Sequence, residues 1–154
     1  MPLIRIALSL GAVNADRLQG FVAAVTDAAM RAESVPEGDP ALRRRSIVIL
    51  DEKAAGALLW GAEVLDDQIR GIFADFHGSA GVLDAARKAR FTAEFHAAAE
   101  AATIPGDPRP VVSSVIFHEA PEGNWGRSGV IARIPDMAHA AGFQHLTSVA
   151  AAPR

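Results

Sequence analysis

The chain has 154 residues, half of them hydrophobic, which is enough for one domain with its own core and no metal or disulfide staple. It has no cysteine, so disulfides, thiolate metal ligands and cysteine nucleophiles are excluded and a reducing compartment is favoured. The 15 basic and 18 acidic residues are mixed along the chain, which argues against a nucleic-acid surface. Residues 1–10 lack the layout of a signal peptide, and apolar runs are shorter than a membrane helix needs. We therefore expect a cytoplasmic protein that binds neither nucleic acid nor membranes.

The first half of the chain predicts a β-α-β unit. Apolar residues alternate along 2–8, as in a strand that is buried on at least one face. Asn14 is a candidate N-cap for an amphipathic helix that ends near Ala32, because apolar residues recur there at helical spacing. Residues 33–40 are expected to form a loop. The short, β-branched segment 46–50 predicts the second strand.

The second half repeats the pattern after a connection at residues 56–67. It predicts a strand at 69–76, a helix at 84–102 and a strand at 111–118. The helix places four apolar residues at its inward positions: Phe91, Phe95, Ala98 and Ala102. The chain is therefore expected to be a tandem of two β-α-β units, over about residues 2–56 and 68–129.

Each unit can bury its helix only on the strands that the helix connects. We therefore expect an α/β (α+β) fold in which one four-stranded sheet carries both helices on one face. The other face keeps apolar residues, so a second subunit is expected to cover it. Residues 130–134 are a candidate for a short extra strand that completes a domain of residues 1–134, and the alanine-rich segment 135–154 is expected to be a weakly ordered tail.

The candidate catalytic group is Pro2. The chain has no phosphate loop, nucleophile elbow, zinc-binding His-Glu-x-x-His helix or EF-hand loop. Removal of Met1 leaves Pro2 as a secondary amine at the start of a buried strand, with an ordinary α-amino pKa of roughly 7.7 to 8.0 that burial lowers. Such an amine is suited to moving a proton between carbon and oxygen. Proline is also common at the second position, so Pro2 alone does not establish a catalyst.

Several segments occur in a recognisable order: Pro2-Leu3-Ile4-Arg5-Ile6, a helix, 35–39, a strand that ends at Asp51-Glu52, and 119–126 with its Glu-Gly-Asn-Trp-Gly turn. In this order the chain resembles the tautomerase superfamily, most of all the fused members that include malonate semialdehyde decarboxylase. The resemblance covers about residues 2–134. It implies a tautomerase/MIF-like fold, a homotrimer, no cofactor, Pro2 as general base or acid, and Trp125 in the pocket.

The resemblance also implies a second catalytic candidate, and the sequence departs from the relatives at one place. Asp39 lies where the decarboxylase-like branch places an aspartate that orients substrate or water, although an Asp-Pro turn explains it equally well. Relatives hold the substrate carboxylate with arginines after the third strand, but the corresponding loop, 76–83, has none, and neither has the loop at 10–13. Either His77 takes over this task more weakly or the substrate lacks a carboxylate at that point.

Other positively charged residues are candidates for holding a substrate carboxylate. Arg127 is the first choice because it follows Trp125 in the turn, and Arg44, within the run 43–45, is either part of a solvated charge run or reaches the site of a neighbouring subunit. His118 is a candidate like His77, although a histidine at a strand end is commonly just hydrogen-bonded. No histidine has metal-ligand spacing, so no metal is expected.

The leading hypothesis is a tautomerase that acts on a small enol, oxo acid or aryl pyruvate, with Pro2 as the proton shuttle. The alternatives are decarboxylation, hydration or dehalogenation of a small 3-oxo or unsaturated acid, and a noncatalytic oligomeric binding protein of the same fold.

Overall fold

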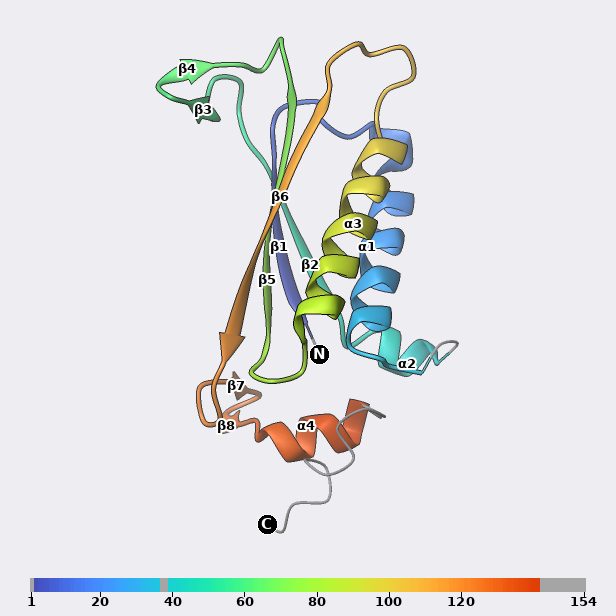
Figure 1. Ribbon diagram of the computed structural model, residues 1–154, viewed down its shortest axis with the longest axis vertical. Coiled ribbons are helices and arrows are strands. Elements are labelled where there is room, and N and C mark those ends of the chain that lie inside the picture. Colours follow the sequence, from blue (N-terminus) through green and yellow to red (C-terminus); the bar gives the residue numbers. More distant parts are fainter. Residues whose placement is uncertain (1, 37–38, 142–154) are drawn as a thin grey trace.

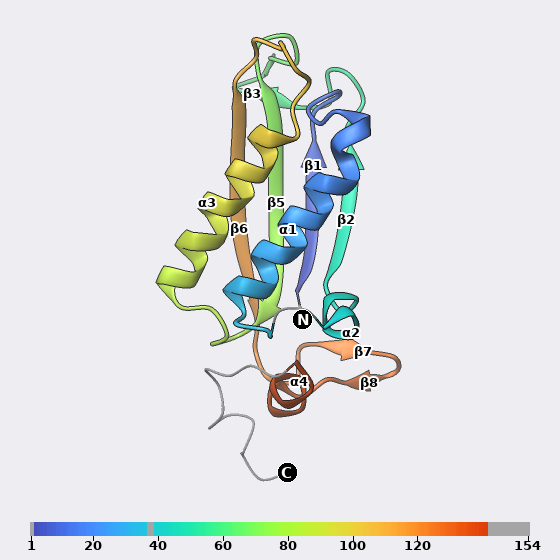
Figure 2. The same cartoon turned by 90° about the vertical axis from the view of Figure 1, so that its right-hand side faces the viewer.

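The computed structural model describes residues 2–36 and 39–141. Its main elements make two β-α-β units: β1 (Leu3–Leu8), α1 (Leu18–Ala32) and β2 (Ile47–Glu52), then β5 (Arg70–Ser79), α3 (Ala85–Ala101) and β6 (Val111–Ala120). The strands form one sheet in the order β2-β1-β5-β6, parallel within each unit and antiparallel where β1 meets β5. Both helices lie side by side on one face of it (Figures 1 and 2). The α+β fold predicted from the sequence is confirmed.

Shorter elements close the two ends of the sheet: a 3-10 turn (Ala15–Arg17), α2 (Pro40–Arg43), β3 (Leu59–Trp60), β4 (Glu63–Val64), β7 (Gly126–Arg127), β8 (Val130–Ile131) and α4 (Ile134–Ala141). The β3–β4 hairpin lies at the end where β1 finishes. The β7–β8 hairpin, α2 and α4 gather at the opposite end, where β1 starts (Figures 1 and 2). None of the described residues belongs to a helix long and apolar enough to span a membrane.

Capping residues set the limits of the two long helices. Asn14 accepts a hydrogen bond from the Asp16 amide at 2.8 Å and starts the 3-10 turn that leads into α1. Asp84 accepts from the Arg87 amide at 2.8 Å and starts α3, where the sequence predicts that helix. Side-chain oxygens at these positions satisfy amides that the first helical turn leaves without a partner.

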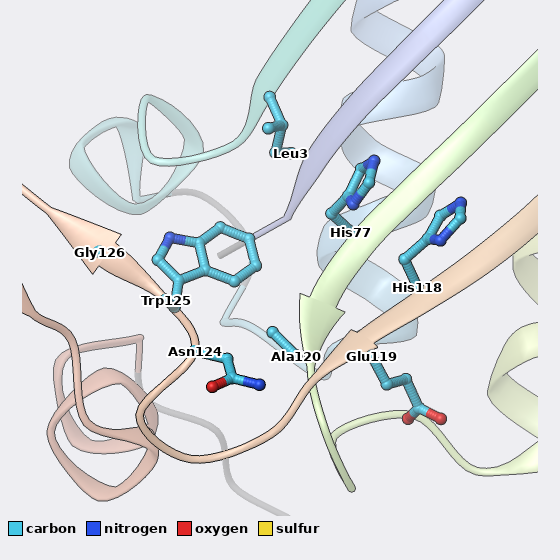
Figure 3. A pocket seen from close by; sticks show the side chains of 8 residues that line it. All are labelled: Leu3, His77, His118, Glu119, Ala120, Asn124, Trp125 and Gly126. Atoms are coloured by element: carbon cyan, nitrogen blue, oxygen red, sulfur yellow. The ribbon is translucent and has the colours of Figure 1, made fainter.

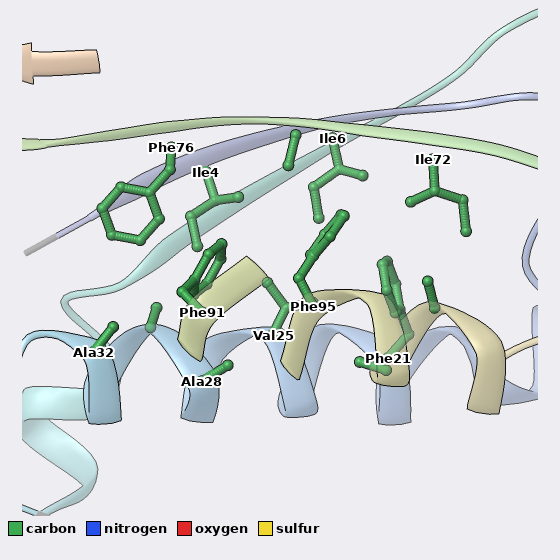
Figure 4. Packing of buried hydrophobic residues seen from close by; sticks show 14 of the residues in the cluster. Ile4, Ile6, Phe21, Val25, Ala28, Ala32, Ile72, Phe76, Phe91 and Phe95 are labelled. Carbon is green, nitrogen blue, oxygen red and sulfur yellow. The ribbon is translucent and has the colours of Figure 1, made fainter. Parts of the chain in front are cut away.

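The core lies between the sheet and the helix pair (Figure 4). Ile4 and Ile6 of β1 and Phe76 of β5 point toward α3, and each is at most 1% exposed. Phe91 is central, because its ring lies 4.9 Å from that of Phe76 and 6.1 Å from that of Phe95. All four predicted inward residues of α3 are buried: Phe91, Phe95, Ala98 and Ala102.

The face of the sheet away from the helices is mixed rather than largely apolar. Ile47, Ile49 and Ile116 are 51%, 43% and 58% exposed on it. The same face also carries Arg5 and Asp75, because alternate strand residues point to the same side. The sequence prediction overlooked these charges because it weighed the apolar alternation alone.

Three segments differ from the prediction. β5 continues to Ser79, so residues 76–79 are strand and not loop, because this stretch pairs with both β1 and β6. A short helix that the sequence did not predict, α2, begins at the end of the predicted loop, where Asp39 caps it. The expected tail includes α4, where Met137 and Ala138 are buried. Residues 142–154, with His145, lie outside the described residues.

A cluster of charged side chains occupies the end of the sheet where β5 begins. Arg70 is only 6% exposed, and its guanidinium donates to the backbone oxygen of Arg109. Asp107 accepts from Arg109 at 2.6 Å, and these hydrogen bonds hold the pKa of Asp107 well below its usual range. The Arg70 amide donates to the Pro110 carbonyl at 2.9 Å, so this end is closed by fixed peptide and ionic contacts.

Candidate active site

A pocket of about 390 Å³ lies at the end of the sheet where β1 starts. Four segments line it: the start of β1, the end of β5, the end of β6 and the turn that leads into β7. The lining residues are Leu3, His77, His118, Glu119, Ala120, Asn124, Trp125 and Gly126 (Figure 3). The volume suits a small organic molecule, and the lining combines apolar walls with a few polar groups, as binding sites commonly do.

The Trp125 side of the pocket is built by a tight turn after β6. The Asn124 amide donates to the Pro121 carbonyl at 3.1 Å, and Gly123 takes a left-handed conformation with φ of 84° that residues with a Cβ rarely adopt. The Trp125 carbonyl then accepts from the Ala132 amide at 2.8 Å. This framework fixes the half-buried Trp125, whose ring points toward the start of β1 (Figure 3).

Two histidines form the opposite wall. The rings of His77 and His118 are stacked with centroids 4.5 Å apart, since the two residues are partners in the β5–β6 register. His118 Nε2 lies 2.7 Å from Asp75 Oδ1. Burial, the neighbouring His118 and Arg5 lower the pKa of His77, and they outweigh the opposite effect of Asp75. The pair therefore offers a neutral imidazole, which donates from one nitrogen and accepts at the other.

Pro2 lies directly before the pocket residue Leu3. It is buried, and its carbonyl accepts from the Ile47 amide at 3.1 Å, which anchors the start of β1 on β2. Leu3 is paired with His77 in the antiparallel register, so Pro2 falls opposite Gly78. The structure thus brings Pro2, Trp125 and His77 to one end of the sheet.

The other sequence candidates have different surroundings. Asp39 accepts from the amides of Ala41 at 2.7 Å and Leu42 at 3.4 Å as the N-cap of α2. Arg44 lines a separate groove between α1 and β2. Arg127 is exposed on β7, two residues beyond Trp125, and is not a lining residue of the described pocket. Within one chain, these three side chains do not share the pocket of Trp125 and His77.

Sequence reasoning gave no role to Glu119 and Asn124, which also line the pocket. Glu119 is held by Lys88 of α3, with 2.8 Å between Nζ and the carboxylate. Asp75 was missed as well, although the alternation of Asp75 and His77 along one strand places both on one face. Among the described residues, no group of three or more His, Cys, Asp or Glu side chains has the arrangement of a metal site.

The fold agrees with the tautomerase/MIF-like fold that the sequence resemblance implies, because solved structures of a fused 4-OT, a member of the cis-3-chloroacrylic acid dehalogenase family and a macrophage migration inhibitory factor share it. Among the solved structures that match, a fused 4-OT in a symmetric trimer has a TM-score of 0.64 and 19% identity, over 88% of this chain and 97% of that one. A member of the cis-3-chloroacrylic acid dehalogenase family has a TM-score of 0.63 and 16% identity, over 96% and 98%.

Macrophage migration inhibitory factor from Oncomelania hupensis has a TM-score of 0.61 and 17% identity, over 98% of this chain and 100% of that one. No protein-family model and no curated protein matches the sequence. At identities below 20%, these likenesses concern the fold.

Proposed function

We propose that the chain is a tautomerase in which removal of Met1 frees the amine of Pro2 for proton transfer between carbon and oxygen of a small enol or oxo acid. The observation that carries the proposal is the position of the pocket, which Leu3, the residue next to Pro2, lines together with Trp125 and His77. Support comes from the fold, which is shared with a fused 4-OT.

The surroundings of Pro2 suit a proton shuttle. Pro2 is buried, and burial lowers the pKa of an amine toward neutral pH, where both protonation states are populated. Trp125 supplies an apolar surface that limits access of water. We assign His77, and the His118 stacked on it, to hydrogen bonds with the carbonyl or enol oxygen of the substrate.

A carboxylate on the substrate needs a positive partner, and Arg127 is the proposed one because it belongs to the hairpin that carries Trp125. Arg44 and Asp39 are proposed to act on the pocket of a neighbouring subunit. Each belongs to the region around α2, at the end of the sheet where β1 starts.

We also propose a homotrimer. Ile47 and Ile49 of β2 and Ile116 of β6 are exposed on the open face of the sheet, and exposed apolar side chains beside polar ones are typical of an interface between proteins. A fused 4-OT of the same fold is a symmetric trimer. Sedimentation should give three times the 16.1 kDa chain mass, and Ile116→Arg should shift the species to the monomer. A wild-type monomer at micromolar concentration would refute this assembly.

The test of the activity combines mass spectrometry with alkylation. The intact mass should show that Met1 is absent, and bromopyruvate, an electrophilic oxo acid, should label Pro2. Enol-to-keto conversion of an aryl enolpyruvate should fall in proportion to labelling, by about 10²- to 10⁴-fold at completion, which is the usual contribution of general acid-base catalysis. Labelling of Pro2 that leaves turnover unchanged, or no turnover at any pH, would contradict the proposal.

Hydration or dehalogenation of an unsaturated acid is the second candidate, because the likeness to a member of the cis-3-chloroacrylic acid dehalogenase family spans 96% of this chain. In that reaction a protonated Pro2 would donate the proton. Turnover of a 3-haloacrylate with release of halide, without conversion of enolpyruvates, would favour this candidate over the tautomerase.

A further inference from the structure

A buried acidic side chain lies at the end of the sheet where β1 starts, on the face that carries the helices. Glu33, the C-cap residue of α1, is only 1% exposed. The last turn of a helix carries the negative end of its dipole, so a carboxylate there is unfavourable, and burial adds a further cost. A buried carboxyl group at the end of a helix is therefore uncommon.

The backbone after Glu33 forms a tight turn that ends α1. Ser34 adopts a left-handed conformation with φ of 53°, which is uncommon for a residue other than glycine. The turn is closed by hydrogen bonds from the Ser34 amide to the Arg31 carbonyl at 3.1 Å and from the Val35 amide to the Met30 carbonyl at 2.9 Å. Strained residues of this kind cluster at functional sites.

Gly78 shows where the carboxyl group points. A Cβ built on Gly78 would lie 3.9 Å from Glu33 Oε1, so the carboxyl group lies over this position of β5. Gly78 belongs to the inward series of β5 with Phe76, and Pro2 belongs to the inward series of β1 with Ile4. The pairing of Leu3 with His77 places Pro2 opposite Gly78, and cross-strand partners lie about 4.5 to 5.5 Å apart at Cβ.

We infer that Glu33 is the counter-ion of the Pro2 amine in the mature chain. The inference rests on the proposed function for the identity of the amine, and it assigns Glu33 a positioning role and not a catalytic one. Two effects then act on the amine in opposite directions: burial disfavours its protonated form and the carboxylate favours it. The balance keeps both forms populated near neutral pH, as a proton shuttle requires.

Several other charged groups on the neighbouring helices and strands have partners of their own. From α3, Arg87 pairs with Asp84 and its Nη2 lies 3.4 Å from Ser34 Oγ, and Lys88 pairs with Glu119 of β6.

On the helix side, Arg31 of α1 pairs with Glu94 of α3 at 2.8 Å. His77 of β5 and His118 of β6 lie on the opposite face of the sheet. Glu33 is therefore the carboxyl group whose removal should affect the Pro2 amine most.

The experiment measures the pH dependence of Pro2 alkylation by bromopyruvate, followed by mass spectrometry, in the wild type, Glu33→Gln and Glu94→Gln. Only the neutral amine reacts, so the midpoint of the profile reports its pKa. Glu33→Gln should lower that midpoint by about one pH unit or more, the usual effect of an opposite charge at this range. Glu94→Gln, which removes a half-buried carboxylate of α3 that pairs with Arg31 of α1, should leave it unchanged.

Glu33→Asp covers the case in which Glu33→Gln does not fold, and its midpoint should fall below that of the wild type because the carboxyl group is withdrawn by one methylene. A folded Glu33→Gln with the wild-type midpoint, or a Glu33→Asp with the wild-type midpoint, would overturn the inference. The measurement needs no turnover, so a shifted midpoint without enolpyruvate turnover would refute the proposed activity and leave the counter-ion standing. Retention of Met1 would refute both.

Discussion

Two Gly→Ala substitutions should change the stability of the protein in opposite directions. Gly78 lies in β5 on the inner face of the sheet, and a Cβ added there would be 3.1 Å from Cε1 of Phe76. Carbon atoms prefer about 3.5 to 4.0 Å, so one of the two groups must move by several tenths of an ångström. The Phe76 ring has little room to move, because its centroid lies 4.9 Å from the ring centroid of Phe91 and 5.5 Å from that of Phe117.

Overpacking of this kind costs about 1 to 3 kcal/mol. For a domain of this size, about 2 to 4 °C of Tm is lost per kcal/mol, so Gly78→Ala should melt about 2 to 12 °C lower. Gly20 in α1 is the matched control, because an added Cβ there meets nothing within 4 Å. Gly20→Ala should raise stability by about 0.5 to 1 kcal/mol through helix propensity.

Urea unfolding at one fixed chain concentration measures both effects, because the stability of an assembly depends on concentration. The midpoint should move down for Gly78→Ala and up for Gly20→Ala, with the slope unchanged. Equal or greater stability of Gly78→Ala would show that Phe76 can move freely, and the close packing inferred around this ring would be wrong.

Three further outcomes follow from the structure. Phe91→Ala should lose about 3 to 5 kcal/mol of unfolding free energy, and a loss below about 1 kcal/mol would refute the central place of this ring in the core. The pKa of His77 is lowered in the folded chain, so near pH 6.5 the unfolded chain binds more protons than the folded one and the protein loses stability as the pH is lowered. His77→Gln should therefore lose less stability between about pH 7.5 and 5.5 than the wild type. Asp39→Ala should cost about 1 kcal/mol by removing the cap of α2, whereas Asp39→Asn should be near wild type in thermal melting; equal losses would contradict the capping role.

The β-α-β units were predictable because each element carries its own local signal. Asn14 caps the 3-10 turn that leads into α1, α3 follows Asp84 where the sequence predicts a helix, and Phe91 and Phe95 recur at helical spacing and are buried. The limits of β5 were less predictable. Residues 76–79 contain Gly78 and read as a loop, but pairing with strands on both sides makes them extended.

The candidate site was predictable only in part, because it depends on contacts between segments distant in the chain. Trp125 was implied by the family resemblance and His77 was predicted from its place at a strand end, and the two share a pocket. Glu33 gave no signal, since an acidic residue at a helix end normally faces water, and here its carboxyl group is buried over Gly78 of β5, which is distant in the chain. The Asp75–His118 contact likewise joins residues 43 positions apart.

The two halves of the chain have the same β-α-β architecture and meet where β1 pairs with β5, but they differ chemically at the starts of these strands. The strand that opens the second half begins at Arg70, whose nitrogen is a peptide amide committed to the Pro110 carbonyl and can never become basic. In the proposed function, only the first half begins with a nitrogen that removal of Met1 would release. Repeating the architecture therefore does not repeat the proposed reactive group, and each chain of an assembly would supply a single such amine, while the end of the sheet at Arg70 is held by peptide and ionic contacts.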